Sequence, residues 1–507
     1  DQDLYPLYRR DLVEGRLTRQ EAAELLGCLW VKFAELEVAK GDMAKQAAQA
    51  NTAQDVTIGG VTPDGKDATN ELTYLILEVT RQLKTVQPSL YLRCHRAMPA
   101  ELWKKAVEVV RDRGDGMPAF LNDESALLNL VGQHHIPLQE ARDWAATGCG
   151  TTQANHASPW DTFIGLNTAK IFELTLSNGV DPRTGKRLGI ATGDPKTFSS
   201  LEELYNAFKR QFEYFVDVSA KSLRLYWLVR NQSYSLPFTS ALTDDCISRG
   251  MDHAAGGARY PQLQKGLCDK GHQNVADSMA AIKKLVFEEK KISMPDLLEA
   301  MSANFEGREA MRQMLLSAPK YGNDDDYVDE IFGEVSLWTQ RRMVEEMNVL
   351  GTNTSTGRGG VTQHLYYGKT VGALPDGRKA WEPLADGSLS PMRGMDVNGP
   401  TAVIKSATKV NHTEVGRNSL FNMKISASSM QGEEGLQKLI ALIKTHFNRG
   451  GHHIQFNLMG QDVLLEAKKH PEQHKDLLVR VAGYSAYFVD LSPEVQDDII
   501  ARAEQCF

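Results

Sequence analysis

The stretch GLQKLIALIKTHFNRGGHHIQFNLMGQDVLLEAKKHPEQHKDLLVRV, residues 435–481, decides the fold class. Apolar residues recur at helical spacing from Gly435 to Phe447, and the alternating run HIQFNL at 453–458 predicts a strand. A second helix is expected at Asp462 to Lys469, followed by the strand-like LLVRV at 477–481. Helix, strand, helix and strand in this order predict an α/β fold.

The opening of the chain predicts a buried helix. Thr18 and Glu21 have the spacing of a capping box, which satisfies backbone N–H groups at a helix start. Apolar residues then recur at helical spacing, so we expect one broad apolar face of this helix to be buried; they are Ala22, Leu25, Leu26, Leu29, Phe33 and Leu36.

Segments rich in Gly, Pro, Asn and Thr predict loops at Gln49 to Asp67, Gly351 to Gly360 and Leu374 to Gly394. The stretch GVDPRTGKR, Gly179 to Arg187, lacks the spacing of a phosphate-binding loop, and we interpret it as a turn. None of these loops has the character of a linker, so we expect one catalytic unit with a distinct C-terminal segment from about Asn411.

Composition narrows the classes of partner. Of the 507 residues, 42% are hydrophobic and 24% charged, with a net charge of -8 and dispersed basic residues, which disfavours nucleic acid. No apolar run approaches the roughly 20 residues of a membrane helix, and the charged start does not resemble a signal peptide, so we expect a cytoplasmic protein. The six cysteines are scattered, and we expect reduced thiols, mostly in the core. The first residue is Asp rather than Met, and we expect a fragment, a processed product or one subunit of a split enzyme.

Two residues stand out for chemistry. Gly483 lies between a predicted strand and a helix start at Ser492-Pro493, where a glycine often serves only a positive φ angle. Cys149 is flanked by Gly148 and Gly150, which predict a sharp, exposed loop tip that presents the thiol to a cavity, although an ordinary buried thiol remains the alternative.

The surrounding motifs carry a resemblance to a known family. RVAGYSAYF at 480–488 resembles the glycyl radical signature of the pyruvate formate-lyase-like glycyl radical enzymes, and ARDWAATGCGTTQ at 141–153 resembles their active-cysteine loop. Further similar stretches cover nearly the whole chain; they are GRLTRQEA, GGVTPDGKDATNELTYL, MPAFLNDE, VADSMAAIKKLVFEEKKIS and KYGNDDDYVD.

The resemblance implies a fold and a domain division. The fold would be a ten-stranded α/β barrel of two antiparallel half-barrels enclosing two fingertip loops. Members of the family are longer, so we expect an incomplete barrel that lacks an N-terminal portion. The division would be a barrel portion at 1–410 with the cysteine loop and a glycine radical domain at 411–507.

The resemblance also implies the chemistry. A separate radical S-adenosylmethionine activase with an iron-sulfur cluster would abstract hydrogen once from Gly483, and the chain itself would need no metal. The stored radical would pass to Cys149, whose thiyl radical takes hydrogen from a small organic substrate. An α-carbon radical suits glycine because no Cβ crowds its planar form. A homodimer is implied by the resemblance as well.

The reaction type stays open among three alternatives. Gly150 replaces the second cysteine of pyruvate formate-lyase, which disfavours that reaction, and Thr151 stands where the family's eliminating enzymes typically carry a glutamate acid or base. The first alternative is a lyase, dehydratase or decarboxylase that breaks a carbon–heteroatom or carbon–carbon bond. The second is addition of a substrate radical to fumarate, which needs no such base, but no Arg for a dicarboxylate occurs between Asp143 and Pro182. The third is a radical-carrying subunit that is inactive without an N-terminal partner.

Candidate pocket residues follow the cysteine and lie in a later stretch, GGVTQHLYY, that predicts a loop leading into a strand. His156 is a candidate acid or base, with an ordinary histidine as the alternative, and Gln363 has a cross-strand amide as its alternative. His134-His135 and His452-His453 are adjacent pairs that lack the spacing of a helical zinc motif. The predicted substrate contacts are Thr151, Gln153, His156, Gln363 and His364, and the predicted radical-loop residues are Arg480, Tyr484 and Ser485.

Overall fold

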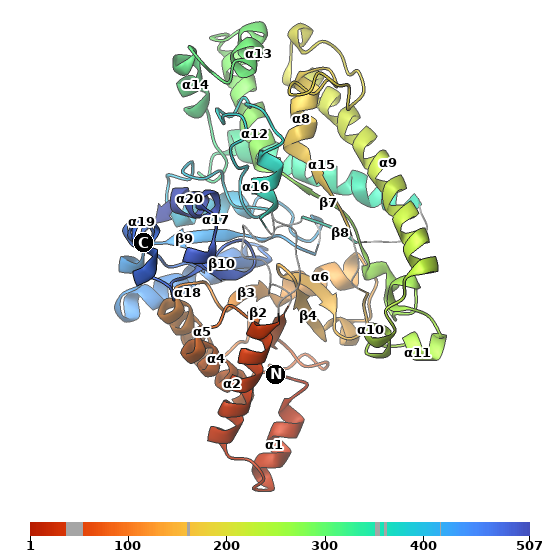
Figure 1. Ribbon diagram of the computed structural model, residues 1–507, viewed down its shortest axis with the longest axis vertical. Helices are drawn as coiled ribbons and strands as arrows, with labels where there is room; N and C mark the ends of the chain where they lie inside the picture. The colour runs from red at the N-terminus through yellow and green to blue at the C-terminus, as the bar shows by residue number, and fades with distance from the viewer. Residues whose placement is uncertain (37–53, 160–162, 350–354, 359–361, 416) are drawn as a thin grey trace. The chain divides into compact units, whose positions relative to one another are not determined.

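The chain is built on a six-stranded mixed sheet and a three-stranded parallel sheet (Figure 1). The computed structural model describes residues 1–507 except 37–53, 160–162, 350–354, 359–361 and 416. The described chain divides into two compact units. The first unit comprises Asp1–Asn155, Gly399–Ile404 and Asn418–Phe507, and the second comprises His156–Asn398 and Lys405–Arg417.

The sheet of the first unit has the order β1-β2-β3-β10-β9-β13. Strands β1, β2 and β3 are parallel, β10 joins β3 in the antiparallel direction, and β9 and β13 continue parallel to β10. Every residue of β2, β3, β9 and β10 is buried, which is typical of strands covered on both faces. The strands are β1 (Asp55–Gly59), β2 (Ser89–Cys94), β3 (Ala119–Asn122), β9 (Asn422–Ile425), β10 (His453–Asn457) and β13 (Glu504–Gln505).

Amphipathic helices accompany this sheet (Figure 1). Helix α5 (Ala100–Arg113) packs against both α4 (Glu71–Leu83) and α18 (Gly432–Asn448). The prediction of a helix from 435 to 447 is confirmed, and so are the following strand β10 and helix α19 (Gln461–Lys469). The alternation of buried helices and strands confirms the α/β class.

Helix α2 (Arg19–Glu35) begins at the predicted capping box, in which Thr18 and Glu21 exchange hydrogen bonds. Its buried side is narrower than predicted. The buried residues are Ala22, Leu26 and Trp30, a stripe with a spacing of four residues. Leu25 is 62% exposed and Leu29 37% exposed, because they lie beside this stripe.

Two β-hairpins complete the first unit. The cysteine hairpin consists of β4 (Trp144–Thr147) and β5 (Thr151–Ala154), and the glycine hairpin consists of β11 (Leu478–Arg480) and β12 (Ser485–Tyr487). Helix α20 (Pro493–Ala501) follows the glycine hairpin at the predicted Ser492-Pro493 start.

The second unit is built on the parallel strands β6, β7 and β8. Its apolar core contains the side chains of α8, α9, α12 and α15, with Phe172, Phe208 and Phe212 in contact through their rings. The elements are β6 (Ile164–Asn167), β7 (Lys265–Lys270), β8 (Ser355–Gly357), α8 (Thr168–Leu176), α9 (Leu201–Ser233), α12 (His272–Ile282) and α15 (Asp326–Val349).

Shorter helices connect these elements. Among the residues that the structure describes, no helix is both long and apolar enough to cross a membrane. The remaining α-helices are α1 (Tyr5–Val13), α6 (Asp123–Gly132), α7 (Leu138–Ala141), α10 (Pro237–Ala241), α11 (Cys246–Arg249), α13 (Met294–Ser302), α14 (Glu309–Leu316), α16 (Gln363–Gly368) and α17 (Pro400–Ala407).

The loop predictions had mixed outcomes. The segment from Leu374 to Gly394 contains neither helix nor strand, and Gly179 to Arg187 forms a turn closed by a bridge between Val180 and Arg187, as predicted. The Gln49 to Asp67 prediction was wrong over β1, whose residues pair with β2, and the part before 54 lies outside the described residues. The Gly351 to Gly360 prediction was wrong over β8, and most of its other residues lie outside the described ones.

The barrel and the domain boundary remain predictions. The described strands occupy separate sheets of six, three, two and two strands, and the two compact units are made of segments that alternate along the sequence.

Candidate active site

Cys149 lies at the tip of the cysteine hairpin. The turn Gly148-Cys149-Gly150 joins β4 to β5, and both glycines have positive φ angles, 61° and 87°. The sharp tip agrees with the prediction, but the expected exposure does not, because Cys149 is only 9% exposed. The thiol is thus enclosed in protein and not open to bulk water.

Gly483 lies at the tip of the glycine hairpin. The predicted position between a strand and a helix is corrected, because β12 pairs back on β11 before α20 begins. The Val481 N–H donates to the Tyr484 carbonyl at 2.9 Å and closes the turn. Gly483 is buried and has a φ of 83°, a conformation that side chains disfavour.

The two hairpin tips meet. A Cβ atom placed on Gly483 would lie 2.6 Å from the Cys149 Sγ, so only a residue without a side chain fits there. The Cys149 thiol lies 3.6 Å from the carbonyl oxygen of Ala482, the neighbour of Gly483. The sulfur and the glycine α-carbon are therefore in direct contact, which is the geometry that hydrogen-atom transfer between them requires.

Strand β1 holds the cysteine hairpin through two side chains on one face of the sheet. Thr57 Oγ1 accepts the Ala146 N–H at 3.0 Å, and Asp55 Oδ2 accepts the Gly148 N–H at 2.6 Å. Asp55 and Thr57 are two residues apart on β1, because side chains on one face of a strand repeat every second residue. Their partners, Ala146 on β4 and Gly148 in the turn after it, are also two residues apart. The cysteine hairpin is thus fixed in register up to the residue before Cys149.

Strand β2 extends this attachment. Arg93 Nη1 donates to the Trp144 carbonyl at 3.1 Å, and the guanidinium lies over the Trp144 ring, 4.7 Å from its centroid. Asp123 accepts from both Arg93 Nε, at 2.9 Å, and Trp144 Nε1, at 2.6 Å. These buried, charge-assisted bonds anchor the start of β4.

Tyr91, also on β2, contacts both hairpin tips. Its register partner on β1 is Thr57, so its side chain lies on the same face of the sheet as Asp55. Its hydroxyl donates to the Gly148 carbonyl and lies 3.3 Å from the Gly483 carbonyl. One phenol therefore connects the turn of Cys149 with the turn of Gly483.

The glycine hairpin is anchored through the fully buried Arg480. Its Nε donates to Gln455 Oε1 at 2.8 Å, and its Nη1 donates to Ser485 Oγ at 3.2 Å. Asn457 binds both polar groups of the Arg480 backbone, accepting from N–H at 2.6 Å and donating to C=O at 2.7 Å. Arg502 donates to the Val481 carbonyl at 2.8 Å. Of the predicted radical-loop residues, Arg480 therefore binds side chains of β10, and Arg480 and Ser485 bind each other.

Burial raises the pKa values of the two side chains that bind Gly148. Burial raises the pKa of Asp55 to about 7, against the opposing effects of the Gly148 N–H bond and the Arg480 charge. Asp55 also lines a cavity of about 250 Å³. Burial, followed by the nearby Asp55 carboxylate, raises the pKa of Tyr91 well above its usual value, so the phenol remains a hydrogen-bond donor.

A neutral histidine forms the wall beside Gly150. A Cβ on Gly150 would lie 3.0 Å from His453 Cδ2, and the Phe421 N–H donates to His453 Nδ1 at 3.2 Å. Burial lowers the pKa of His453 well below its ordinary value. His452 bonds to Thr152 Oγ1 at 3.2 Å, which joins β10 to β5.

The predicted substrate contacts belong to different units. Thr151 and Gln153 are buried on β5, and Thr151 Oγ1 accepts from Asn418 Nδ2 at 3.1 Å, which leaves its own O–H to donate. His156 is exposed and begins the second unit. Gln363 and His364 lie in the second unit at the start of helix α16, not at the start of a strand as expected, with His364 buried. The structure therefore brings Cys149, Gly483 and Thr151 together within the first unit, while the other three residues belong to the second.

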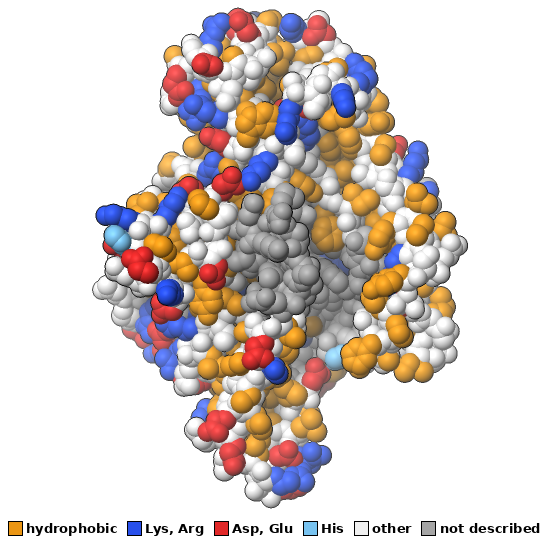
Figure 2. Space-filling view, viewed as in Figure 1, with side chains coloured by type: hydrophobic (Ala, Val, Ile, Leu, Met, Phe, Trp, Pro, Cys, Tyr) orange, Lys and Arg blue, Asp and Glu red, His pale blue; other side chains and the backbone are white. Residues whose placement is uncertain are grey.

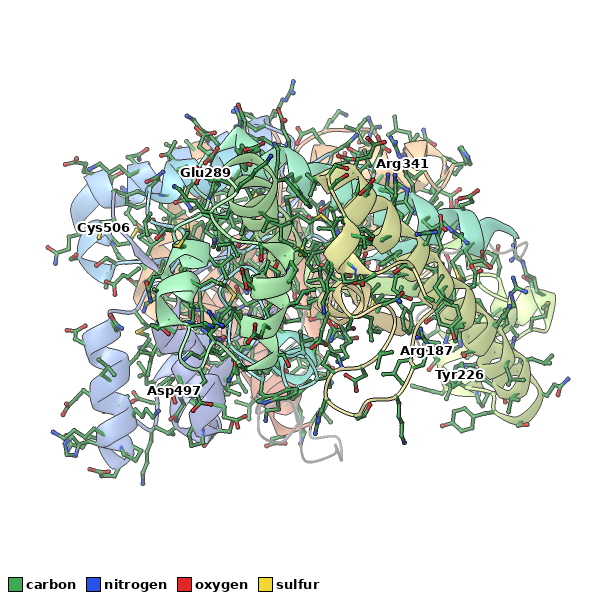
Figure 3. The ribbon with its side chains drawn as sticks, turned by 90° about the horizontal axis from the view of Figure 1, so that it is seen from above. Arg187, Tyr226, Glu289, Arg341, Asp497 and Cys506 are labelled. Atoms are coloured by element: carbon green, nitrogen blue, oxygen red, sulfur yellow. The ribbon has the colours of Figure 1, made fainter. Side chains whose placement is uncertain are left out.

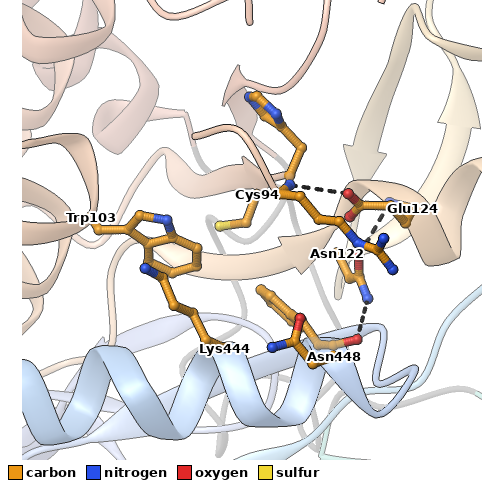
Figure 4. A pocket seen from close by; sticks show the side chains of 9 residues that line it. Cys94, Trp103, Asn122, Glu124, Lys444 and Asn448 are labelled. Carbon is orange, nitrogen blue, oxygen red and sulfur yellow. Dashed lines mark hydrogen bonds between the residues drawn. The ribbon is translucent and has the colours of Figure 1, made fainter. Parts of the chain in front are cut away.

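A second cavity of the first unit contains another cysteine (Figure 4). It has a volume of about 200 Å³ and is lined by Cys94, Trp103 and Lys444 among others. Cys94 follows Arg93 on β2 and so points to the opposite face of the sheet from the hairpins. Burial raises its thiol pKa well above the ordinary value, which disfavours a reactive thiolate.

The six cysteines are all free thiols. None of the six forms a disulfide, as predicted, and four are buried, whereas Cys28 and Cys506 are exposed. Among the described residues, no cluster of three or more His, Cys, Asp and Glu side chains is arranged to hold a metal ion.

The residues that hold the cysteine hairpin are not among those predicted from the sequence. Asp55, Thr57 and Tyr91 lie about 60 to 90 residues before Cys149 in ordinary strand sequence. The available signal was the polar alternation in β1, where Asp55 and Thr57 share a face, but it does not reveal the hairpin that they bind.

The fold and the site together define a class: an α/β protein in which a buried thiol on one hairpin tip contacts a side-chain-free glycine on another. The sequence matches the pyruvate formate lyase-like family over residues 1–368 and the glycine radical family over residues 385–489. The chain belongs to the pyruvate formate lyase-like family and carries its glycine radical region.

Individual relatives agree with this assignment. The chain is 41% identical to trans-4-hydroxy-L-proline dehydratase from Clostridioides difficile, over 100% of its own length and 64% of that protein. It is 39% identical to isethionate sulfite-lyase from Oleidesulfovibrio alaskensis, over 99% of its length and 61% of that protein. The chain thus spans about three fifths of the length of these relatives.

Solved structures match the fold. The glycerol-bound B12-independent glycerol dehydratase from Clostridium butyricum has a TM-score of 0.94 at 36% identity, covering 100% of this chain and 64% of that one. A glycyl radical enzyme from Archaeoglobus fulgidus has a TM-score of 0.91 at 33% identity, covering 100% of this chain and 64% of that one.

Proposed function

We propose that this chain carries the radical chemistry of a glycyl radical enzyme, with Gly483 as the radical store and Cys149 as the residue that attacks substrate. The observation that carries this proposal is the contact between the two hairpin tips, where a Cβ on Gly483 would lie 2.6 Å from Cys149 Sγ. In the transfer, the S–H bond of Cys149 breaks and a Cα–H bond forms at Gly483, leaving the unpaired electron on sulfur. Substrate then gives a hydrogen atom to the sulfur, and the product radical recovers it.

The proposed reaction is an elimination from a small organic substrate that breaks a carbon–heteroatom or carbon–carbon bond. Relatives that support it are named hydroxyproline dehydratase, isethionate sulfite-lyase and (2S)-3-sulfopropanediol dehydratase. These names share a small substrate with a hydroxyl group or a sulfonate as a leaving group. The burial of Cys149 favours such chemistry because water is kept from the reactive sulfur.

A second candidate is addition of a substrate radical to fumarate. The feature that favours it is Thr151, whose hydroxyl accepts from Asn418 and can donate but cannot act as a base near neutral pH. The two reactions differ in a measurable way, because only the addition consumes fumarate.

The proposal includes partners. Activation requires a separate radical S-adenosylmethionine iron-sulfur enzyme, which acts once on Gly483, and the chain supplies no metal of its own to the reaction. We place the protein in the cytoplasm, as a homodimer that acts on a small molecule.

A further polypeptide portion is the remaining partner in this proposal. The chain spans 61–64% of the length of its relatives, and the second unit exposes a run of large apolar side chains that we call the α9–α11 face (Figure 2). Phe238 is 78% exposed and Ile247 76%, and a groove of about 300 Å³ lies among them; Tyr226 lies on the outer side of α9 (Figure 3). Exposed apolar patches of this kind mark binding surfaces. The face comprises Val218, Leu225, Tyr226, Leu228, Val229, Tyr234, Phe238, Leu242, Ile247 and Met251.

This partner proposal has its own test. The portion that the relatives carry beyond the matched region is supplied as a separate polypeptide, and binding is measured by sedimentation. Phe238→Glu with Ile247→Glu should abolish binding, whereas Val397→Glu, at an equally exposed apolar residue elsewhere, should not. Equal binding by both variants would overturn the proposal, and loss of self-association instead would assign the face to the homodimer.

The radical proposal is tested by anaerobic electron paramagnetic resonance after incubation with activase, S-adenosylmethionine, reductant and the additional portion. The wild-type chain should show a doublet, because one α-hydrogen remains on the glycyl radical, and Gly483→Ala should show none. No wild-type signal with an activase that activates a relative in parallel would support the inactive-subunit alternative.

A further inference from the structure

We propose that Tyr91 and Asp55 act as positioning residues that set the distance between Cys149 and Gly483 for hydrogen-atom transfer. This inference rests on the proposed function and adds to it two residues outside both sequence motifs. Neither residue takes part in the bond changes. Each acts through one of the two peptide groups that flank Gly148, the residue before the cysteine.

Asp55 and Tyr91 hold Gly148 from both sides. Asp55 accepts its N–H at 2.6 Å, and Tyr91 donates to its carbonyl oxygen. A peptide residue held at both its donor and its acceptor has little freedom to rotate, so the direction in which the chain enters Cys149 is fixed. Gly148 itself, with a φ of 61°, is a glycine with wide backbone freedom when its N–H and C=O groups are not held.

The second step is the connection to the other hairpin. The Tyr91 hydroxyl lies 3.3 Å from the Gly483 carbonyl oxygen, and that carbonyl belongs to the residue that stores the radical. One rigid side chain on the buried strand β2 therefore contacts both tips and fixes the distance between them. Tyr91 is fully buried, so its position is set by the sheet and not by solvent.

The third step is the sensitivity of the transfer. Hydrogen-atom transfer depends steeply on the distance between donor and acceptor, and a displacement of about 1 Å lowers the rates of positioned reactions by roughly a hundredfold. Loss of the phenol oxygen removes the contacts with both tips at once, while the aromatic ring still fills its place in the sheet. Tyr91→Phe should therefore slow the transfer without unfolding the site.

The transfer can be measured without a substrate. In deuterated water the Cys149 thiol exchanges to S–D, so each reversible transfer delivers deuterium to Gly483. The doublet of the glycyl radical then collapses toward a singlet at a rate that reports transfer between the two residues. The measurement uses the activated full chain with its additional portion.

The Tyr91→Phe variant should show a doublet of wild-type size, and this doublet should collapse about 10 to 100 times more slowly than in the wild type. The matched control is Tyr321→Phe, in the second unit. It removes a buried hydroxyl that donates to the Leu389 carbonyl at 3.0 Å, and its doublet should collapse at the wild-type rate. Asp55→Asn should slow the collapse less, because the amide oxygen can still accept the Gly148 N–H, and should reduce the hydrogen-exchange protection of that amide.

The outcomes separate this inference from the proposed function. A wild-type doublet with equal collapse rates in Tyr91→Phe and Tyr321→Phe would overturn the positioning role and leave the radical proposal intact. Absence of the doublet in the wild-type chain would overturn both. An unchanged protection of the Gly148 amide in Asp55→Asn would remove Asp55 from the inference.

Discussion

The cysteine hairpin and the glycine hairpin lie on the same face of one sheet, yet they are held by different chemistry. The cysteine hairpin depends on Asp55, a carboxyl group with a pKa near 7 that lines a cavity. The glycine hairpin depends on the amide side chains of Gln455 and Asn457, which have no titratable group, around the buried Arg480. In the proposed function, the hairpin of the cysteine that attacks substrate is therefore held by a titratable group, whereas the hairpin of the radical glycine is held by amide side chains.

Oxygen should have the largest effect, and on one hairpin only. A radical on Gly483 adds oxygen at the α-carbon, and the backbone then breaks there, while the cysteine hairpin stays intact. Mass spectrometry of activated protein after exposure to air should find cleavage at Gly483. Gly483→Ala treated in parallel should remain whole, and an intact wild-type chain with a verified doublet would contradict the assignment.

Gly483→Ala should also lower stability by about 2 to 4 kcal/mol. The new methyl group would lie 2.6 Å from Cys149 Sγ, in addition to the strain of a positive φ. The control is Gly450→Ala, which has a φ of 90° but open space around the new Cβ, and it should lose only about 1 kcal/mol. Equal losses in urea denaturation would show that the hairpin tips do not press together.

Asn457→Ala tests the anchor of the glycine hairpin. It removes two hydrogen bonds and leaves the buried N–H and C=O of Arg480 without these partners, which should cost about 2 to 3 kcal/mol. Asn206→Ala, at an exposed residue of helix α9, should cost less than about 0.5 kcal/mol. The loss in Asn457→Ala should be independent of pH between 5 and 8, and a pH-dependent loss would erase the contrast between the hairpins.

Per pH unit, the pH dependence from Asp55 is the smallest of these effects on stability. Its folded-state pKa, about 7, lies above its ordinary value of 3.8, so the folded chain binds more protons than the unfolded chain between these pH values. Its contribution to stability is therefore complete below pH 4 and is lost as pH rises to 7, at no more than about 1.4 kcal/mol per pH unit. The difference in unfolding free energy between wild type and Asp55→Asn should follow this slope. Asp64→Asn, at an exposed carboxylate, should leave the same pH window unchanged, and parallel profiles for wild type and Asp55→Asn would contradict the prediction.

The sequence predicted the parts of this site that are local. Gly483 and Cys149 stand in compact motifs with glycines at the turns, and periodicity located α18, β10 and α19 correctly. It could not show that Gly483 sits on a hairpin, because the pairing of β11 with β12 depends on only three residues in each strand. It also could not show that Cys149 is buried.

The residues that hold the cysteine hairpin could not be predicted from the sequence for another reason. Tyr91 and Asp55 act through contacts with the backbone of Gly148, and a backbone contact leaves no complementary side chain to find in the sequence. The same limit applies to α16, where the predicted strand at Gln363 proved to be a helix, because a six-residue helix has too few turns to show a period.

The most direct test of the central claim is the exchange of the Gly483 α-hydrogen in deuterated water, compared between the activated wild-type chain and Cys149→Ser. The account predicts that the wild-type doublet collapses toward a singlet while the Cys149→Ser doublet persists, because the serine O–H bond is too strong to return hydrogen to glycine. Collapse at equal rates in both proteins would show that hydrogen reaches Gly483 by a route other than Cys149, and would contradict the account.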